Sequence, residues 1–556
     1  MDPEEEEIKK LKPKKPPLTE EEKKKKFGNA YDPNYTKKHR GNGPRNPWQT
    51  YAINEEIAEQ VANIPYNVLA GVTFDLGADA FTFGSPTSTL SAKPERQQAL
   101  MVITYMPSIG IAEDRTDGIN MSAVQLYERT RRKNSGAKVY ESPDLMMYVL
   151  AMRDIYGVAL FIGRALKLAS KYEVVNKSIP DILLTALNVD PIDLRGNRAQ
   201  YSAQYNALIE RINTFPIPRV FPCFDREDFV ESNVFMDSSS LRGQMYVYRR
   251  EGYYLFTPEK EETGTSLTWN WFKRPVAPNF KANPLSYYLT ILEEQVNAVF
   301  EDVDAQTMQG DLMKAFEKEP LYQLKVVGLD ETIQFTFDED ALAQFENMRV
   351  ALGQPNAGTG SGATGYELAA IGIIGNLNIT QKDNNIVFTP TISTSGSATT
   401  AFVSQTKTII NSHKDKPDYR DNLEWTRLIV TKRIASTGSN AVIEKITSCG
   451  LEIPLRFECW RYTSGPSNSF NSYITTVGTN FNRPTGIEQF DWHPIIYEWS
   501  THVSSGTVDG FNISGINGDL KVMTVIDDST LQLINHEAVN AAFYLRHTSL
   551  GGESKG

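Results

Sequence analysis

The stretch "ESPDLMMYVLAMRDIYGVALFIGRAL", residues 141–166, is so apolar that it raises the question of a membrane span. Arg153 and Asp154 interrupt it, and its longest run without a charge, from Ile155 to Gly163, covers nine residues. A helix that crosses a bilayer needs roughly 20 apolar residues, and charges near the bilayer centre are costly. The stretch therefore predicts a helix of a soluble protein and not a membrane span.

The first residues of this stretch are typical of a helix start. Ser142 is expected at the N-cap, Pro143 at the first helical position and Asp144 in the first turn. Apolar residues then surround the predicted helix on nearly all sides, which predicts burial within a large helical body. Core packing is the favoured interpretation of its methionines, and a methionine-lined cofactor groove is the alternative.

Length and composition indicate a globular chain. It has 556 residues, 40% of them hydrophobic, and a formal net charge of −11, which predicts several domains or one large domain with an insertion. The three cysteines form no CxxC pair, and their odd number favours a reducing compartment over a disulfide framework. The N-terminus has no apolar stretch of the kind that a signal peptide needs.

Residues 1–47 differ from everything that follows. They contain thirteen Lys or Arg and nine Asp or Glu residues, a net charge of +4, so the remainder of the chain carries −15. The charges stand in blocks, and aliphatic core residues are almost absent. Such a composition cannot offset the entropy of ordering, so we predict a disordered charged N-terminal arm.

The next part of the chain, to about residue 325, carries mainly helical patterns. Capping residues and apolar spacing predict four helices, at Ile119–Lys133, Pro143–Ser170, Pro180–Asn188 and Asn283–Glu319, the last of them capped by Asn283 with Pro284 following. Between them, Gln244–Arg249 and Tyr253–Phe256 are expected to form a hairpin around Gly252.

The sequence changes in character after the glycine-rich stretch at 351–365. Residues from about 376 to 510 are rich in Thr, Ser, Asn, Val and Ile in short runs, which predicts strands joined by polar turns. A helical pattern, with Ser529 or Thr530 as its expected cap, returns at 527–545. The predicted fold class is α+β, with four parts: the arm at 1–47, a mainly helical domain at 48–325, a β-rich inserted domain at 326–510, and a C-terminal helix in 511–556.

No catalytic or metal-binding pattern stands out. "GSGATG" (360–365) matches a phosphate-binding fingerprint, but a predicted helix precedes it, so a flexible linker is favoured. "HEAVN" has Asn540 where a zinc site needs a second histidine, and Cys223 has no recognisable histidine partner. We therefore predict no catalytic residue, no metal site and no cofactor, and no enzymatic activity.

The arm carries the candidate contacts to nucleic acid. Its basic side chains can neutralise phosphates without reading sequence, although the interleaved acidic blocks equally fit an arm that only solubilises the chain. The candidate RNA-contacting residues are Lys9, Lys10, Lys12, Lys14, Lys15, Lys23, Lys24, Lys25, Lys26, Lys37, Lys38 and Arg40. A further apolar stretch, "YELAAIGIIGNL" (366–377), is expected to be buried, with a membrane-active loop as the alternative.

Several short motifs together resemble one known family. They are "PSIG" (107–110), "NSG" (134–136), "PDLM" (143–146), "LAM" (150–152), the segment "MYVYRREGYYLFTP", "FDWHP" (490–494) and "VIDDSTLQLIN" (525–535). This series is similar to picobirnavirus capsid proteins, most specifically between about 100 and 260. The residues that carry the resemblance in the apolar region are Asn134, Ser135, Gly136, Pro143, Asp144, Leu145, Met146, Leu150, Ala151 and Met152.

The resemblance implies a viral coat protein. It implies a mostly helical shell domain and a smaller projecting domain, and dimers that assemble in the host cytoplasm into an icosahedral virion. The shell would enclose a double-stranded RNA genome, contact that RNA weakly and non-specifically through the arm, and meet a host membrane during entry. The alternative is a structural RNA-binding protein that uses the basic arm without forming a shell.

Overall fold

The computed structural model describes residues 99–545 with gaps. The residues outside the description within that span are 135, 137–139, 172–177, 239–242, 261–263, 274–281, 352–372, 396–406, 415–418, 438–440, 464–471, 479–483, 485–486, 488–489, 505–506, 518–521 and 544.

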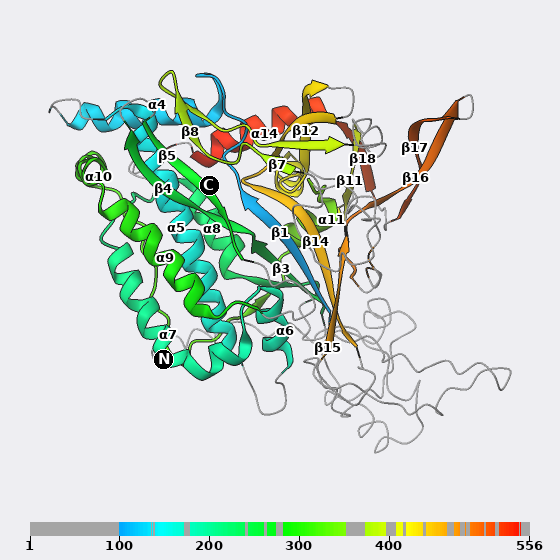
Figure 1. The fold of residues 1–556 in the computed structure, drawn as a ribbon, viewed down its shortest axis with the longest axis horizontal. Coiled ribbons are helices and arrows are strands. Elements are labelled where there is room, and N and C mark those ends of the chain that lie inside the picture. The colour runs from blue at the N-terminus through cyan, green and yellow to red at the C-terminus, as the bar shows by residue number, and fades with distance from the viewer. Residues whose placement is uncertain are drawn as a thin grey trace, which may run out of the picture. The chain divides into compact units, whose positions relative to one another are not determined.

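A six-stranded mixed sheet lies at the centre of the described chain (Figure 1). Its order is β15-β14-β1-β3-β2-β6. The strands are β1 (Leu100–Pro107), β2 (Val234–Met236), β3 (Met245–Arg250), β6 (Phe335–Thr336), β14 (Glu452–Thr463) and β15 (Ser472–Gly478). β1 pairs in parallel with β3 and antiparallel with β14, so Leu100 and Trp460, far apart in the sequence, lie opposite each other in one sheet.

The two faces of this sheet belong to different hydrophobic cores, because successive residues of a strand point to opposite faces. Leu100 and Val102 of β1 belong to the larger core, whereas Met101 and Ile103 belong to a second core on the other face. Burial on both faces explains why β1 reads as a continuous apolar run and not as an alternating one.

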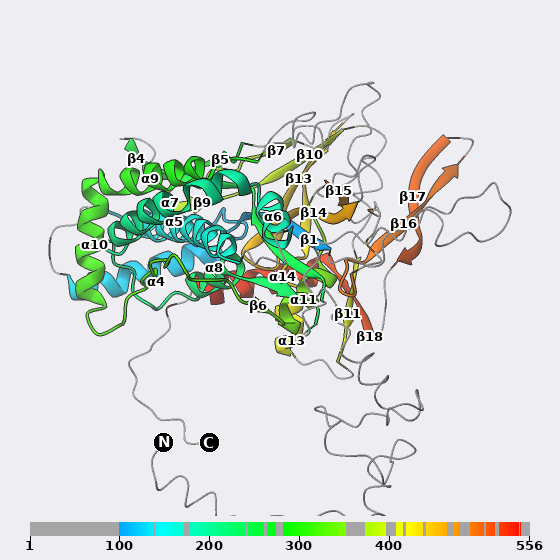
Figure 2. The same cartoon turned by 90° about the horizontal axis from the view of Figure 1, so that it is seen from below.

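Helices cover the face of the larger core (Figures 1 and 2). They are α4 (Gly118–Lys133), α5 (Ser142–Ala169), α6 (Ser178–Ala186), α7 (Pro191–Ile212), α8 (Pro222–Ser232), α9 (Leu285–Phe300) and α10 (Val303–Ala315). α5 packs against α4, α6, α7, α8, α9 and α10, and also against the hairpin of β4 (Gly252–Lys260) and β5 (Gly264–Trp271). It is therefore the central helix of this body.

The second half of the described chain is mainly strands, as the sequence predicts. They are β7 (Ile373–Gly375), β8 (Thr380–Lys382), β9 (Asn385–Val387), β10 (Thr391–Ser395), β11 (Lys407–Ser412), β12 (Val430–Thr437), β13 (Ala441–Ser448), β16 (Ile496–Ser504), β17 (Thr507–Asn517) and β18 (Val522–Asp527). β12, β13, β10 and β7 form a four-stranded sheet, and the pairs β11–β18, β16–β17 and β8–β9 are two-stranded. Among the described residues, three helices accompany them: α11 (Glu339–Asn347), α13 (Tyr419–Trp425) and α14 (Asp528–Phe543). An α+β fold is confirmed.

The hairpin predicted around Gly252 is wrong. β3 already has β1 on one edge and β2 on the other, so neither edge is open to β4. Only Glu251 separates β3 from β4, which is shorter than the usual loop of two to five residues of a β-hairpin. β4 instead pairs with β5, and Gly252 lies so close to Asn270 that an added Cβ would clash with its carbonyl oxygen.

Three predicted helix boundaries are also wrong. The helix expected over 283–319 is two helices, because Asp302 ends the first and caps α10 by accepting a hydrogen bond from the Ala305 N–H at 2.6 Å. The Asn283 side chain donates to the Lys273 carbonyl (2.7 Å) and does not cap α9, which begins at Leu285. α14 begins at Asp528, so Ser529 and Thr530 lie inside it and are not its cap.

Candidate functional site around helix α5

Helix α5 is buried along its whole length. All its residues are buried except Leu160 and Lys167. The helix is long and apolar enough to cross a membrane by length and composition alone, yet 94% of its most apolar window is buried inside the protein. The sequence-based prediction of a helix enclosed by other helices is confirmed.

The start of α5 is fixed by a reciprocal cap, although the capping residue is not the predicted Ser142. Glu141 is the N-cap, and Asp144 accepts a hydrogen bond from the Glu141 N–H at 3.0 Å in a capping box. The other oxygen of Asp144 accepts from Thr265 Oγ1 (3.0 Å) and Gln381 Nε2 (2.7 Å). One carboxylate thus joins the first turn of α5 to strands β5 and β8.

The charges in the middle of α5 are buried and paired. Arg153 donates to Glu227 of α8 at 2.7 Å and to the Ser108 carbonyl at 2.9 Å. Asp154 accepts from Arg250 at 3.0 Å and from Gln295 Nε2 at 2.7 Å. The same residues that make the sequence unsuitable for a membrane therefore connect α5 to α8, α9 and the central sheet.

A second set of ion pairs lies further along α5. Arg164 donates to Glu231 at 3.0 Å and to the Tyr248 carbonyl at 2.8 Å. Glu231 also pairs with Arg250 Nε at 3.2 Å and accepts a hydrogen bond from the Tyr105 hydroxyl. Burial raises the pKa of Glu231, and the two guanidinium groups oppose this shift. Three arginines and three carboxylates balance one another inside the core.

The carboxylate partners were missed by sequence reasoning. Glu227 and Glu231 stand four residues apart on α8, so both face α5, and this spacing was the available signal. The close packing also needs Gly157, because an added Cβ would lie 2.9 Å from both Glu227 Oε2 and an Arg250 Nη atom. The sequences of α5 and α8, taken separately, do not predict that these two helices pack against each other.

The residues that carry the family resemblance fall into two neighbouring places. Pro143, Leu145, Met146, Leu150, Ala151 and Met152 are buried in α5 together with Asp144. Asn134 ends α4 and its amide donates to the carbonyls of Thr130 (2.9 Å) and Asp311 (3.0 Å).

The Gly136 carbonyl, at the same end of α4, accepts from Arg131 at 2.7 Å, while Ser135 lies outside the described residues. The Asp311 side chain accepts from Tyr140, just before α5, at 2.7 Å. Asp311 therefore joins the end of α4 to the approach to α5.

The candidate RNA contacts cannot be placed in this way. All twelve cations, from Lys9 to Arg40, lie outside the described residues, as do 360–365 and 366–372. Of the apolar stretch 366–377, the described part includes strand β7, which pairs with β10.

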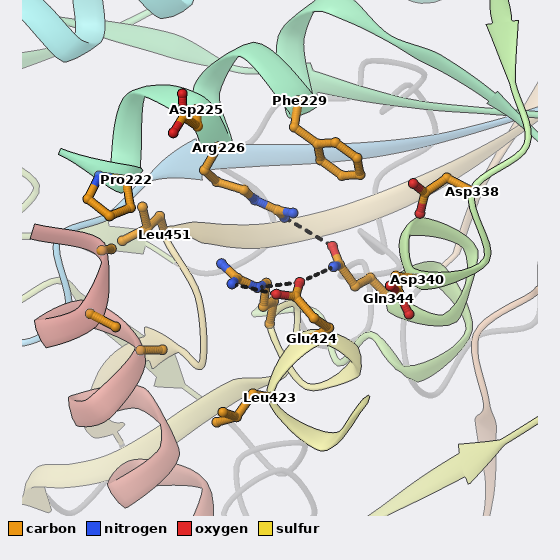
Figure 3. Close-up of a pocket in the computed structure, with 14 residues that line it drawn as sticks. Pro222, Asp225, Arg226, Phe229, Asp338, Asp340, Gln344, Leu423, Glu424 and Leu451 are labelled. Carbon is orange, nitrogen blue, oxygen red and sulfur yellow. Dashed lines mark hydrogen bonds and ion pairs between the residues drawn. The ribbon is translucent and has the colours of Figure 1, made fainter. Parts of the chain in front are cut away.

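A cavity of about 750 Å³ lies beside α8 (Figure 3). Its lining comes from α8, α11, α13, α14 and nearby loops: Pro222, Asp225, Arg226, Phe229, Asp338, Asp340, Gln344, Leu423, Glu424, Arg427, Leu451, Ala538, Ala541 and Ala542. Gln344 joins its two sides, accepting from Arg226 at 3.0 Å and donating to Glu424 at 3.4 Å.

The charged groups of this cavity already have structural roles. Arg226 makes a bidentate ion pair with Glu452 at 3.0 and 2.9 Å. Burial alone would raise the pKa of Glu452, but the Arg226 guanidinium outweighs burial and holds that pKa below its ordinary value. Asp338 caps α11, and Asp340 accepts from the Trp425 indole at 3.2 Å. The carboxylates thus stabilise helix ends and packing.

Cys223 and His536, the two residues considered for catalysis or metal binding in the sequence, both lie within helices. Burial raises the pKa of the Cys223 thiol to about 12, so the thiolate that a nucleophile requires is strongly disfavoured. His536 lies within α14. Among the residues that the structure describes, no group of three or more His, Cys, Asp or Glu side chains is arranged to hold a metal ion.

Comparisons with known proteins agree with this structural reading. The family model "Picobirnavirus, Capsid protein" matches residues 48–444. The capsid protein precursor of Human picobirnavirus (strain Human/Thailand/Hy005102/-) is 29% identical over 314 residues, 56% of this chain and 55% of that protein. The match thus spans about half the length of this relative.

A solved structure is similar over most of the chain. A chain from the X-ray crystallographic structure of the picobirnavirus capsid matches with a TM-score of 0.74 and 33% identity, covering 91% of this chain and 100% of that one. The resemblance seen in short motifs therefore extends over most of the fold. The chain belongs to the picobirnavirus capsid protein family and is a structural component of the virion.

Proposed function

We propose that the chain dimerises and that the dimers assemble into a small icosahedral shell enclosing a double-stranded RNA genome. The observation that carries the proposal is the match of nearly the whole chain to a chain of the picobirnavirus capsid. The pairing of the charges of α5 adds support, because Arg153, Asp154 and Arg164 have their partners inside the same subunit, as a unit that is repeated in a shell requires. Assembly in the host cytoplasm and delivery of the genome across a host membrane belong to the same proposal.

In this proposal, the domains predicted from the sequence are the shell domain and the projecting domain. Residues 48–325, with helices α4 to α10, form the shell domain, and residues 326–510, with most of the later strands, form the projecting domain. The C-terminal segment returns to the shell through α14, which packs against α4 and α8. β14 joins the two domains, since it belongs to 326–510 but pairs with β1.

Sedimentation velocity on the purified chain tests assembly. We expect a dimer together with a fast-sedimenting species whose proportion depends on salt and pH. A chain that sediments only as a monomer over a wide range of both would overturn the proposal.

The second candidate function is RNA binding without a shell, favoured by the cations of the arm. The two candidates differ in what removal of residues 1–47 does. If the arm packages RNA inside a shell, its deletion leaves particles but lowers the RNA they retain, measured as the ratio of absorbance at 260 and 280 nm.

A matched control keeps the length of the arm and replaces its twelve candidate cations with glutamine. This variant should lose RNA as the deletion does, because phosphate neutralisation requires the charges. Unchanged RNA content in both variants would refute a packaging role. Salt-dependent RNA binding by a chain that never forms particles would favour the second candidate.

A further inference from the structure

The cavity beside α8 combines an apolar wall with several carboxylates (Figure 3). Its volume of about 750 Å³ lies within the range of roughly 300–1,000 Å³ that small-molecule sites occupy. Half of its lining is apolar, contributed by Pro222, Phe229, Leu423, Leu451, Ala538, Ala541 and Ala542. Its size and lining therefore suit a small molecule that has an apolar part.

The charged side chains give the cavity an excess of negative charge. Four carboxylates and two guanidinium groups line it, a formal charge of −2. Both guanidinium groups are already paired, Arg226 with Glu452 at 2.9 Å and Arg427 with Glu424 at 2.8 Å. The lining carboxylates that these arginines leave unbalanced are Asp225, Asp338 and Asp340.

Asp338 and Asp340 each have an oxygen that can accept from a ligand. Asp338 Oδ1 accepts from the Ala341 N–H at 2.8 Å, and Asp340 Oδ1 accepts from the Trp425 indole at 3.2 Å. Both donors are neutral, and within the described chain neither carboxylate takes part in an ion pair. A carboxylate has about four acceptor positions, so each aspartate can bind a cation and keep its present hydrogen bond.

An organic cation fits this cavity better than a metal ion does. Among the described residues, no group of three or more His, Cys, Asp or Glu side chains is arranged to hold a metal, and an apolar wall offers a metal no ligand. Figure 3 shows Asp225 on the side of Pro222 and Leu451, and Asp338 and Asp340 on the side of α11. Carboxylates on two sides of an apolar surface match a molecule that has an ammonium group at each end.

We propose that the cavity binds a linear polyamine. One ammonium group lies at Asp338 and Asp340, the methylene chain packs against Leu423 and the alanines of α14, and a second ammonium group lies toward Asp225. The hydrogen bonds between ammonium and carboxylate groups are charge-assisted, and the methylene groups leave water on binding. The site does not depend on assembly of the chain into a shell.

Isothermal titration calorimetry with spermidine tests the proposal. The sample is the full-length chain freed of RNA, because RNA phosphates themselves attract polyamines. We expect saturable binding of one spermidine per chain, and binding of butylamine that is at least about tenfold weaker, because butylamine has only one ammonium group. The absence of saturable binding at millimolar spermidine, or equal affinity for butylamine, would overturn the proposal.

Two substitutions at the start of α11 locate the site. Asp338→Asn and Asp340→Asn should each lower the affinity for spermidine about tenfold, because each removes a charge-assisted hydrogen bond. Asparagine at 338 still caps α11, and asparagine at 340 still accepts from the Trp425 indole, so both variants should fold, as circular dichroism checks.

Glu339→Gln is the matched control for these variants. Glu339 is exposed, lies between the two aspartates in the first turn of α11 and does not line the cavity. Its substitution removes the same charge, yet should change the affinity by about twofold or less, because water screens an exposed charge that makes no contact with the ligand. An equal loss of affinity in all three variants would contradict the proposal, since the ligand would then respond only to the overall negative charge of this region.

A change in the apolar wall gives an independent test. Ala538→Trp places a large side chain in the cavity and leaves both aspartates unchanged, so spermidine binding should be lost. Wild-type affinity in a folded Ala538→Trp variant would place the ligand elsewhere on the chain. Particle formation is measured separately by electron microscopy, so failure of the polyamine site and failure of the proposed function are distinguishable.

Discussion

Glu231 interacts with three buried side chains, Tyr105, Arg164 and Arg250. Glu231→Gln keeps the shape of the side chain but leaves two guanidinium groups with one negative charge fewer. Because breaking a buried ion pair leaves an uncompensated charge, we expect a loss of about 3–5 kcal/mol in the free energy of unfolding, measured by urea denaturation at fixed protein concentration.

An exposed pair serves as the control for this prediction. Glu128 lies 3.5 Å from Arg132 on the surface of α4, and both side chains are largely exposed. Glu128→Gln should change the free energy of unfolding by about 0.5 kcal/mol or less, since water screens such pairs. Similar losses in the two variants would mean that the buried network adds nothing particular to stability.

Asp237, beside the central sheet, gives a pH-dependent prediction. Burial raises its pKa to about 6, with nearby Asp491 adding to the shift, although the Gln244 N–H and the Tyr246 hydroxyl donate to its carboxylate. A carboxyl whose pKa is higher in the folded than in the unfolded state stabilises the fold at low pH. This contribution is lost as the pH rises through about 6.

Asp237→Asn removes this titration. We expect the variant to be more stable than the wild type at pH 7.5, by about 1 kcal/mol because the site is only partly buried, and to lose that advantage as the pH falls to 4. Thermal unfolding at both pH values measures the difference. A stability difference that stays constant over this range would contradict the assignment.

At the scale of elements, α5 shows what a sequence pattern can establish. Its position, its burial and its exclusion from a membrane all follow from its own residues, because apolar side chains on nearly all sides admit few environments. The pairing of β3 could not be derived in that way. It depends on β1 and β2, which come from distant parts of the chain and occupy both of its edges.

The single helix predicted over 283–319 is wrong for a different reason. The apolar spacing continues across Asp302, so periodicity predicts one helix, and only the cap formed by that side chain divides it. An aspartate at this position fits two structures equally well. It can lie on the polar face of a continuous helix, or it can be the N-cap of a new helix. Local competition between helix and cap decided the outcome.

Met152 tests the packing of α5. Its side chain is fully buried, so Met152→Asp places an unpaired charge in the core and should abolish soluble expression or cooperative unfolding. Met313→Asp is the matched control on α10, where the native side chain is 47% exposed, and it should remain soluble. A soluble Met152→Asp chain with wild-type stability would show that α5 is not enclosed.

At the scale of the whole molecule, the family and the α+β class could be predicted from the sequence. The contacts between residues far apart in the sequence could not. The sequence predicts Asp144 in the first turn of a helix, but its hydrogen bonds to Thr265 and Gln381 depend on strands more than 100 residues away. The RNA contacts assigned to the arm stay predictions.

Electron microscopy of the purified chain, expressed alone, tests the central claim of self-assembly most directly. The account predicts closed particles of uniform size with icosahedral symmetry, formed by the one protein without other viral components. Fields that contain only monomers or irregular aggregates, across a range of salt and pH in which the chain stays folded, would contradict it.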